Sequence, residues 1–137
     1  MNVAGKKSLI DNLFDGNDQI NTITEKIIGC AFKVSNTLGT GFLESVYENA
    51  LMIEIRKTGL KIEQQKPIKV LYEGEIVGDF YADLLAEEKV LIELKTVRNL
   101  DDVHIAQCLN YLRATDLTIC LLINFGKPKV EIKRIIN

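Results

Sequence analysis

Apolar residues recur at helical spacing over the first part of the chain, and the pattern breaks at glycines. Thr22 followed by Glu25 is a capping-box pattern, and the apolar residues after it return every three or four positions up to Gly39. A second run with the same period begins near Leu43, and Gly59 is placed to be the first residue beyond its end. The pattern predicts two helices before any strand.

The apolar spacing then changes to a period of two, which is typical of strands. Residues 62–64 and 68–72 predict strand on either side of Pro67, which indicates an edge position or a bend because proline cannot donate to a ladder. Residues 76–85 predict the next strand. A short charged turn at residues 87–89 joins it to another apolar run, so a β-hairpin is expected here.

The last third of the chain alternates one helix with two strands. Asp101 can cap a helix that runs to about Thr115. Residues 117–124 are a continuous apolar run, which predicts a buried central strand, and residues 130–136 predict a final one. The order α-α-β-β-β-α-β-β predicts an α/β fold: a three-layer-like sandwich with a mixed central sheet.

Length and composition predict one domain. The 137 residues suffice for one packed core, and 47 % hydrophobic with 26 % charged residues is ordinary for a globular domain. Residues 1–20 are expected to be an N-terminal tail or lead-in, and residues 21–137 the single domain. No apolar run approaches the roughly 20 residues that span a bilayer, and the N-terminus lacks a secretion-signal pattern. No membrane partner is therefore expected. Three widely spaced cysteines outside any ligand motif favour free thiols and a cytoplasmic location.

The formal net charge of −2 excludes a strongly basic protein that binds DNA without specificity. Any contact with DNA must therefore come from a local basic patch or a bound metal. The densest basic stretch lies near the C-terminus. It either contacts a phosphate backbone or is a charged edge strand that resists aggregation, and its residues are Lys127, Lys129, Lys133 and Arg134.

Three charged residues stand in the apolar hairpin where a buried strand should carry none: Asp83, Glu93 and Lys95. Glu93 and Lys95 are two positions apart and leave the same face of their strand. Asp83 joins them only if it stands directly opposite Glu93, which requires an odd number of connecting residues, such as 87–89. Asp79 shares the face of Asp83 if no bulge intervenes, and it competes for the same role.

If the faces agree, two carboxylates and an ammonium group converge on a rigid sheet. Close carboxylates repel each other, and a divalent cation that prefers oxygen ligands, Mg²⁺ or Mn²⁺, relieves the repulsion. A lysine beside them can stabilise negative charge on a phosphoryl group. The alternative is an ion pair between Glu93 and Lys95, with Asp83 capping a turn.

These residues resemble a known motif. Asp83, nine intervening residues and then Glu-Leu-Lys at residues 93–95 resemble the PD-(D/E)XK nuclease motif, with Ala82 in place of the name-giving proline. Residues 41–47 (Gly-Phe-Leu-Glu-Ser-Val-Tyr) resemble the signature of the GxxExxY protein family. Residues 107–111 resemble the QxxxY motif of RecB-type nucleases in the same superfamily. The resemblance covers nearly the whole chain and implies a restriction-endonuclease-like core with the order α-β-β-β-α-β.

The resemblance also implies roles for residues outside the hairpin. It implies that Glu44, in the first turn of the second helix, completes the metal site, although a first-turn glutamate also compensates a helix dipole. Tyr47, one turn later, either orients Glu44 or is a core aromatic residue. The resemblance further implies that Gln107 lies near the carboxylates, with Tyr111 as its support and as a substrate contact. The alternative is an exposed amide and a core tyrosine.

The expected activity is that of a metal-dependent nuclease that hydrolyses phosphodiester bonds of DNA. Glu44, Asp83 and Glu93 would hold Mg²⁺ or Mn²⁺. Lys95 would position the attacking water or stabilise charge on the phosphate, and Gln107 would orient a ligand. The alternative is a non-catalytic module that binds nucleic acid or protein on a nuclease-like fold. Domains this small often dimerise to grip a duplex, so a homodimer is a further expectation.

Overall fold

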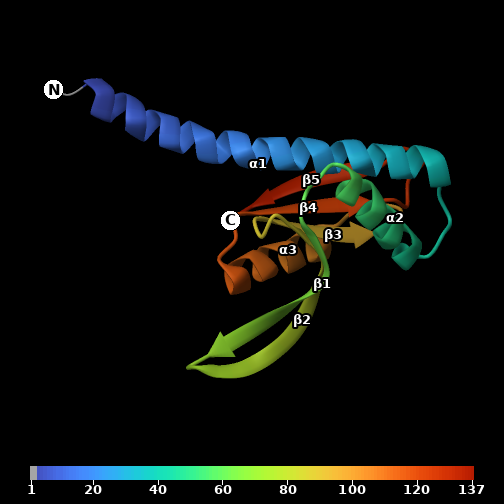
Figure 1. Cartoon of the computed structure of the whole chain (residues 1–137). Coiled ribbons are helices and arrows are strands. Elements are labelled where there is room, and N and C mark those ends of the chain that lie inside the picture. Colours follow the sequence, from blue (N-terminus) through green and yellow to red (C-terminus); the bar gives the residue numbers. More distant parts are fainter. Residues whose placement is uncertain (1–2) are drawn as a thin grey trace.

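Eight elements follow one another in the predicted order. The structure, a computed structural model, describes residues 3–137, with their side chains from residue 18 onward. Figure 1 shows the elements, whose bounds are α1 (Val3–Leu38), α2 (Glu44–Lys57), β1 (Ile62–Tyr72), β2 (Glu75–Ala86), β3 (Val90–Lys95), α3 (Asp102–Thr115), β4 (Ile119–Asn124) and β5 (Glu131–Ile136). The predicted α/β class is confirmed.

The five strands form one mixed sheet in the order β1-β2-β3-β4-β5. β3 and β4 run parallel, and the other three neighbouring pairs run antiparallel. α1 and α2 cover one face and α3 the other, each over its own apolar core (Figure 1). All six residues of β4 are buried, which confirms that the continuous apolar run is a central strand.

The first helix begins far earlier than predicted, so the expected start at Thr22 is wrong. Thr22 lies inside α1, where its hydroxyl donates to the carbonyl oxygen of Asp18 at 2.8 Å, one turn earlier. No proline stands between residues 3 and 38, and a single Gly or Asn inside a helix costs only about 1 kcal/mol or less. The lead-in expected over residues 1–20 is therefore helical from Val3, and α1 projects beyond the body at this end (Figure 1). None of the described helices is long and apolar enough to cross a membrane.

The second helix ends as predicted and is anchored at its start. Thr58 is the C-cap of α2, and Gly59 follows with a φ of +87°, a conformation that glycine adopts without strain. At the other end, the Tyr47 hydroxyl donates to the carbonyl oxygen of Gly39 at 2.6 Å, and its ring stacks on Phe125 with centroids 4.8 Å apart. Tyr47 is therefore a core aromatic residue that ties α2 to the preceding connection.

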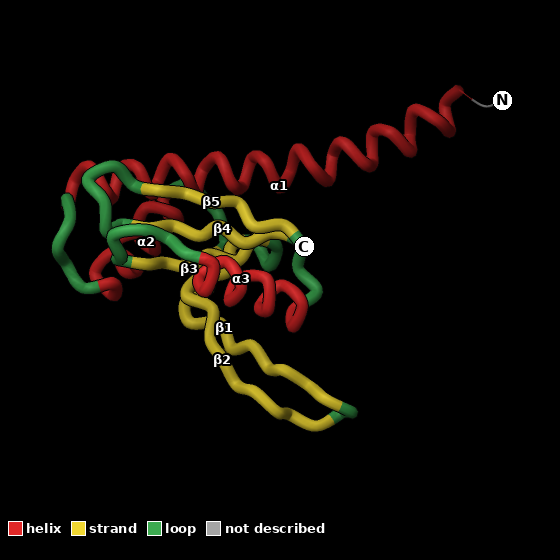
Figure 2. Tube along the Cα trace, turned by 180° about the vertical axis from the view of Figure 1, so that it is seen from behind, coloured by secondary structure: helices red, strands yellow, loops and turns green. Residues whose placement is uncertain are grey.

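The first two strands extend beyond the rest of the sheet as a two-stranded arm. β1 runs through Pro67 without interruption, so the edge position is confirmed and the predicted break is absent. The pairing of β2 with β3 stops at Leu84 opposite Ile92, whereas β1 and β2 stay paired as far as Tyr72 and Glu75. Figure 2 shows the arm leaving the sheet on the side of α3. We call the point where β2 separates from β3 the fork.

Candidate functional site

The fork brings Asp83 and Glu93 together. Three residues, 87–89, connect β2 to β3, and the ladder register continued by one residue sets Asp83 opposite Glu93, which confirms the predicted parity. Beyond the last pair of the β2–β3 ladder, the side chains of Asp83 and Glu93 accept hydrogen bonds from main-chain N–H groups. The backbone N–H of Leu94 donates to Asp83 Oδ2 at 2.8 Å, and that of Asp83 donates to Glu93 Oε1 at 3.1 Å.

Glu93 is a buried carboxyl group beside a second acid. Its side chain is surrounded so closely that the residue is only 3 % exposed. Burial, and next the negative charge of Asp83, raise the pKa of Glu93 to about 9. At neutral pH the Glu93 carboxyl group therefore carries a proton unless a cation replaces it.

Helix α2 contributes carboxyl groups to the same place. Glu44 is the first residue of α2, as predicted, and it is half-buried. Burial raises the pKa of Glu44, and the nearby charges of Asp83 and Glu48 raise it further, while Lys95 acts in the opposite direction. The charge on Glu44 therefore depends on the same residues that form the fork.

Glu48 belongs to this cluster although no motif indicates it. It is buried, its Oε1 accepts from Gln65 Nε2 at 2.9 Å, and its Oε2 accepts from Gln64 Nε2. Gln65 Nε2 also lies 3.5 Å from Asp83 Oδ1 and so links the two acids. Burial and the neighbouring Asp83 raise the pKa of Glu48, against the effect of the glutamine hydrogen bonds. The signal that would have found Glu48 is its four-residue spacing from Glu44, which places both on one helix face.

Lys95 ends β3 as a half-buried and unpaired cation. Among the side chains of residues 18–137, no carboxylate lies at ion-pair distance from its ammonium group. The alternative of an ion pair between Glu93 and Lys95 is therefore not observed. Asn124 holds the chain just beyond it, because its amide accepts from Val97 N at 3.0 Å and donates to Val97 O at 2.8 Å. This leaves Lys95 available to an anionic ligand.

Gln107 and Tyr111 form the pair that the four-residue spacing predicts. Gln107 Nε2 donates to the Tyr111 hydroxyl at 3.0 Å. Burial, followed by the charge of Glu93, raises the pKa of Tyr111, so the tyrosine is near the acidic cluster. Both residues line a groove that Lys95 also lines. Within the described residues Gln107 makes no hydrogen bond to a carboxylate, so its expected closeness to a metal stays a prediction.

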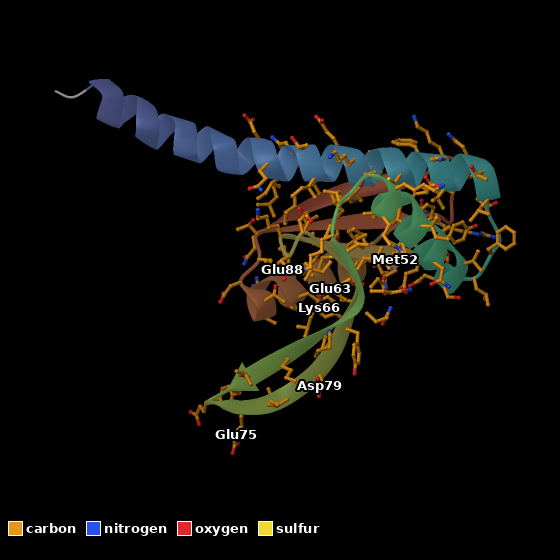
Figure 3. The ribbon with its side chains drawn as sticks, viewed as in Figure 1. Met52, Glu63, Lys66, Glu75, Asp79 and Glu88 are labelled. Carbon is orange, nitrogen blue, oxygen red and sulfur yellow. The ribbon has the colours of Figure 1, made fainter. Side chains whose placement is uncertain are left out.

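Asp79 does not compete for the site. It lies on the exposed arm, well away from the fork, as Figure 3 shows. Its Oδ1 is 3.4 Å from the Lys69 ammonium on the neighbouring strand of the arm. Asp83 is therefore the aspartate of β2 that meets Glu93.

The four basic residues near the C-terminus do not form one patch. Lys133 and Arg134 are consecutive in β5 and lie on opposite faces of the sheet, and Arg134 donates to Asn21 Oδ1 on α1 at 3.0 Å. Lys127 pairs with the first residue of β5 at 3.4 Å, and the exposed Lys129 lies in the turn before that strand. A substrate contact by any one of them stays a prediction, but they cannot act as a single surface.

The acidic cluster offers only oxygen ligands, the donor type that Mg²⁺ and Mn²⁺ prefer. Asp83 and Glu93 each use one oxygen for a main-chain N–H, which leaves the other for a ligand. Within the described residues, no three acidic, histidine or cysteine side chains already stand close enough to enclose an ion.

The chain is similar to known proteins in sequence and in fold. The profile of the PD-(D/E)XK nuclease superfamily matches residues 21–135. The sequence has no significant match among curated proteins. The crystal structure of SSO0001 is similar, with a TM-score of 0.53 and 16 % identity, over 68 % of this chain and 49 % of the other, so the chain spans about half the length of that protein. An alkaline exonuclease (LHK-Exo) from Laribacter hongkongensis has a TM-score of 0.47 and 14 % identity, over 78 % and 76 % of the two chains.

Proposed function

The chain belongs to the PD-(D/E)XK nuclease superfamily, and from that premise we propose that it is a metal-dependent nuclease that hydrolyses phosphodiester bonds of DNA. The observation that carries the proposal is the acidic cluster at the fork with an unpaired ammonium group beside it. Burial and mutual repulsion raise the pKa values of Glu44, Glu48 and Glu93. A site of this kind is unfavourable without a compensating cation, and a purely structural carboxylate pair has no need of a free lysine.

The acids of the two strands and the helix would share the metal. Asp83 and Glu93 would hold Mg²⁺ or Mn²⁺ from the sheet, with Glu44 and Glu48 completing the site from α2. Nucleases of this superfamily generally use divalent metal ions. When bound, such an ion would lower the pKa of a water molecule and neutralise charge on the phosphate.

The remaining residues would act on the substrate directly. Lys95 would donate a hydrogen bond to a phosphate oxygen and stabilise the charge that builds up during attack. Gln107, held in place by the Tyr111 hydroxyl, would orient the phosphate or the water. The water oxygen then bonds to phosphorus as the bond to one ester oxygen breaks. The products are a phosphate monoester and a free hydroxyl group.

The narrower assignment to the GxxExxY family rests on residues 41–47 and adds a role for Glu44. The alternative function, binding without turnover, would use the same fold and the same acidic cluster. Turnover separates the two, because a module that only binds would not hydrolyse the substrate.

A cleavage assay tests the proposal. Labelled single-stranded, double-stranded and branched DNA would be incubated with the protein and Mn²⁺ or Mg²⁺, beside the Lys95→Ala variant and a sample containing EDTA. We expect cleavage of at least one substrate by the wild type, lost with EDTA and strongly reduced in Lys95→Ala. Cleavage of none of them by a folded wild-type protein that responds to the metal would favour the non-catalytic alternative.

A further inference from the structure

A groove of about 940 Å³ opens between the arm and helix α3 and leads to the proposed site. The arm supplies one wall, which includes Lys69 and Phe80, and α3 supplies the other, which includes Gln107 and Tyr111. Lys95 stands where the groove meets β3. Figures 1 and 2 agree that the arm and α3 lie on the same side of the sheet. The groove is therefore continuous with the residues proposed to act on phosphate.

The charge of the groove favours an anion. Its lining contains Lys69, Lys95 and Arg113, and it contains no aspartate or glutamate, although the chain as a whole has a net charge of −2. Lys69 shares its charge with Asp79, but both side chains are more than half exposed, so this ion pair is worth little. Within the described residues, Lys95 and Arg113 have no acidic partner at ion-pair distance.

Two aromatic rings stand within the groove. Phe80 and Tyr111 have ring centroids 5.8 Å apart with an interplanar angle of 45°. Phe80 is 44 % exposed. Gly78 leaves room for its ring, because a Cβ atom at Gly78 would lie only 2.8 Å from a ring carbon of Phe80. The phenyl ring is thus an accessible stacking surface.

We infer that this groove takes one unpaired strand of DNA, with a base against Phe80 and phosphates at Arg113 and Lys95. A strand that lacks a partner exposes base faces, and aromatic rings along a positively charged groove bind such faces without regard to sequence. A duplex stacks its bases on one another and exposes only their edges and the phosphates, so it would leave the ring without a base face to stack on. The inference rests on the proposed function and adds the substrate class.

The test measures binding and hydrolysis separately. Binding of a fluorescently labelled 12-nucleotide oligothymidine and of a blunt 12-base-pair duplex is followed by anisotropy in EDTA, where no cleavage occurs. We expect the single strand to bind at least tenfold more tightly than the duplex. Phe80→Ala and Phe80→Leu should each weaken single-strand binding about fivefold or more, because base stacking on one ring is worth at least about 1 kcal/mol. Arg113→Ala should weaken it and reduce its dependence on salt.

Matched controls use residues outside the groove. Tyr72→Ala removes an aromatic ring that is 67 % exposed at the far end of the arm, and Arg56→Ala removes an exposed cation of α2. Both should bind the single strand as the wild type does. Hydrolysis of bis(p-nitrophenyl) phosphate with Mn²⁺, which needs the acidic cluster but no strand, should be unchanged in Tyr72→Ala and Arg56→Ala.

The two proposals fail in different ways. The single-strand proposal would be overturned if strand and duplex bound equally well, or if both folded Phe80 variants bound the strand as tightly as the wild type. This holds even if the small diester is hydrolysed. If the strand bound selectively through Phe80 but neither DNA nor the small diester was hydrolysed, the single-strand proposal would be supported and the proposed nuclease activity overturned. Thermal melting of each variant verifies that it is folded.

Discussion

Asp83 and Glu93 each accept a hydrogen bond from the main chain of β2 or β3 at the fork, at 2.8 Å from Leu94 N and 3.1 Å from Asp83 N respectively. The two side chains therefore close the fork, and in the proposed site they would also bind the metal. Replacement by alanine would remove both roles at once. Asn and Gln keep an accepting oxygen and remove the ionisable group, so they are the informative substitutions here.

The raised pKa of Glu93 predicts how stability depends on pH. The folded protein keeps a proton on Glu93 up to a pKa of about 9, whereas the unfolded chain loses it near the ordinary value of 4.5. Between these two values the folded state binds more protons, so the free energy of unfolding falls as the pH rises, by at most about 1.4 kcal/mol per pH unit. Urea unfolding in EDTA between about pH 6 and pH 8 measures this slope.

Glu93→Gln should flatten this part of the slope, because glutamine does not titrate. Glu25→Gln, a change at an exposed position of α1, is the matched control and should leave the slope as it is. The raised pKa values of Glu44 and Glu48 add to the slope in the same direction at lower pH. A slope that is identical in Glu93→Gln and wild type would show that Glu93 is already ionised in the folded protein.

Metal binding is predicted to stabilise the protein through Asp83. Mg²⁺ or Mn²⁺ at about 100 times its Kd should raise the free energy of unfolding by about 2.7 kcal/mol. The increase should be larger at about pH 8 than at pH 6, because the ion must displace the proton of Glu93. Asp83→Asn should abolish the increase, and Asp79→Asn on the arm should retain it. Melts with metal and with EDTA measure the effect, and a full metal response in Asp83→Asn would exclude Asp83 as a ligand.

The parity of the hairpin could be worked out from the sequence because it depends only on local counting. Three connecting residues and a side-chain period of two place Asp83 opposite Glu93 whatever the rest of the chain does. Gly59 and Asp101 were predictable for a similar reason, since they end or begin helices through their own backbone or side chain. Local rules of this kind account for most of the elements and for the strand part of the site.

The parts that the sequence did not reveal depend on tertiary contacts. Glu48 joins the cluster only because α2 packs against the β1 segment that contains Gln64 and Gln65. The four basic residues near the C-terminus do not share one surface, because Arg134 is turned toward Asn21, a residue 113 positions earlier. Helix α1 extends past Thr22 because a capping pattern inside a favourable helical run does not stop the helix. Local spacing shows that Glu48 shares a helix face with Glu44, but it does not show which strand that face meets.

Glu48 is predicted to matter more for metal binding than Glu44. Glu48 is buried and is linked through Gln65 to Asp83, whereas the structure gives Glu44 only charge interactions with the cluster. Glu48→Gln should therefore weaken the metal-induced stabilisation more than Glu44→Gln does. Isothermal titration of Mg²⁺ and Mn²⁺ into both variants makes the comparison directly. If Glu44→Gln weakened metal binding more than Glu48→Gln, the metal ligand on α2 would be Glu44, the residue that the motif indicates.

Tyr47→Phe should affect stability without affecting the site. The substitution removes a hydroxyl that donates to Gly39 O at 2.6 Å and accepts from Phe42 N at 3.3 Å, so we expect a loss of about 1–2 kcal/mol in the free energy of unfolding. Tyr72→Phe, at an exposed position, should lose almost nothing. The metal response should be the same in both variants. A weaker metal response in Tyr47→Phe alone would revive the idea that Tyr47 orients Glu44.

A substitution at Lys95 is predicted to reduce turnover without reducing metal binding. The Lys95 ammonium group has no carboxylate partner among the described residues. It lines the groove beside the acidic cluster, so it is placed to bind a phosphate group of the substrate. Lys95→Ala should reduce kcat by about 10²–10³-fold, as the loss of one group that stabilises transition-state charge does in other enzymes. It should leave the metal-induced stabilisation intact or slightly increase it, because a positive charge near the cation is removed. Lys89→Ala, in the β2–β3 turn, is the control and should change neither quantity. Unchanged turnover in a Lys95→Ala protein that still binds metal would assign the chemistry to another residue.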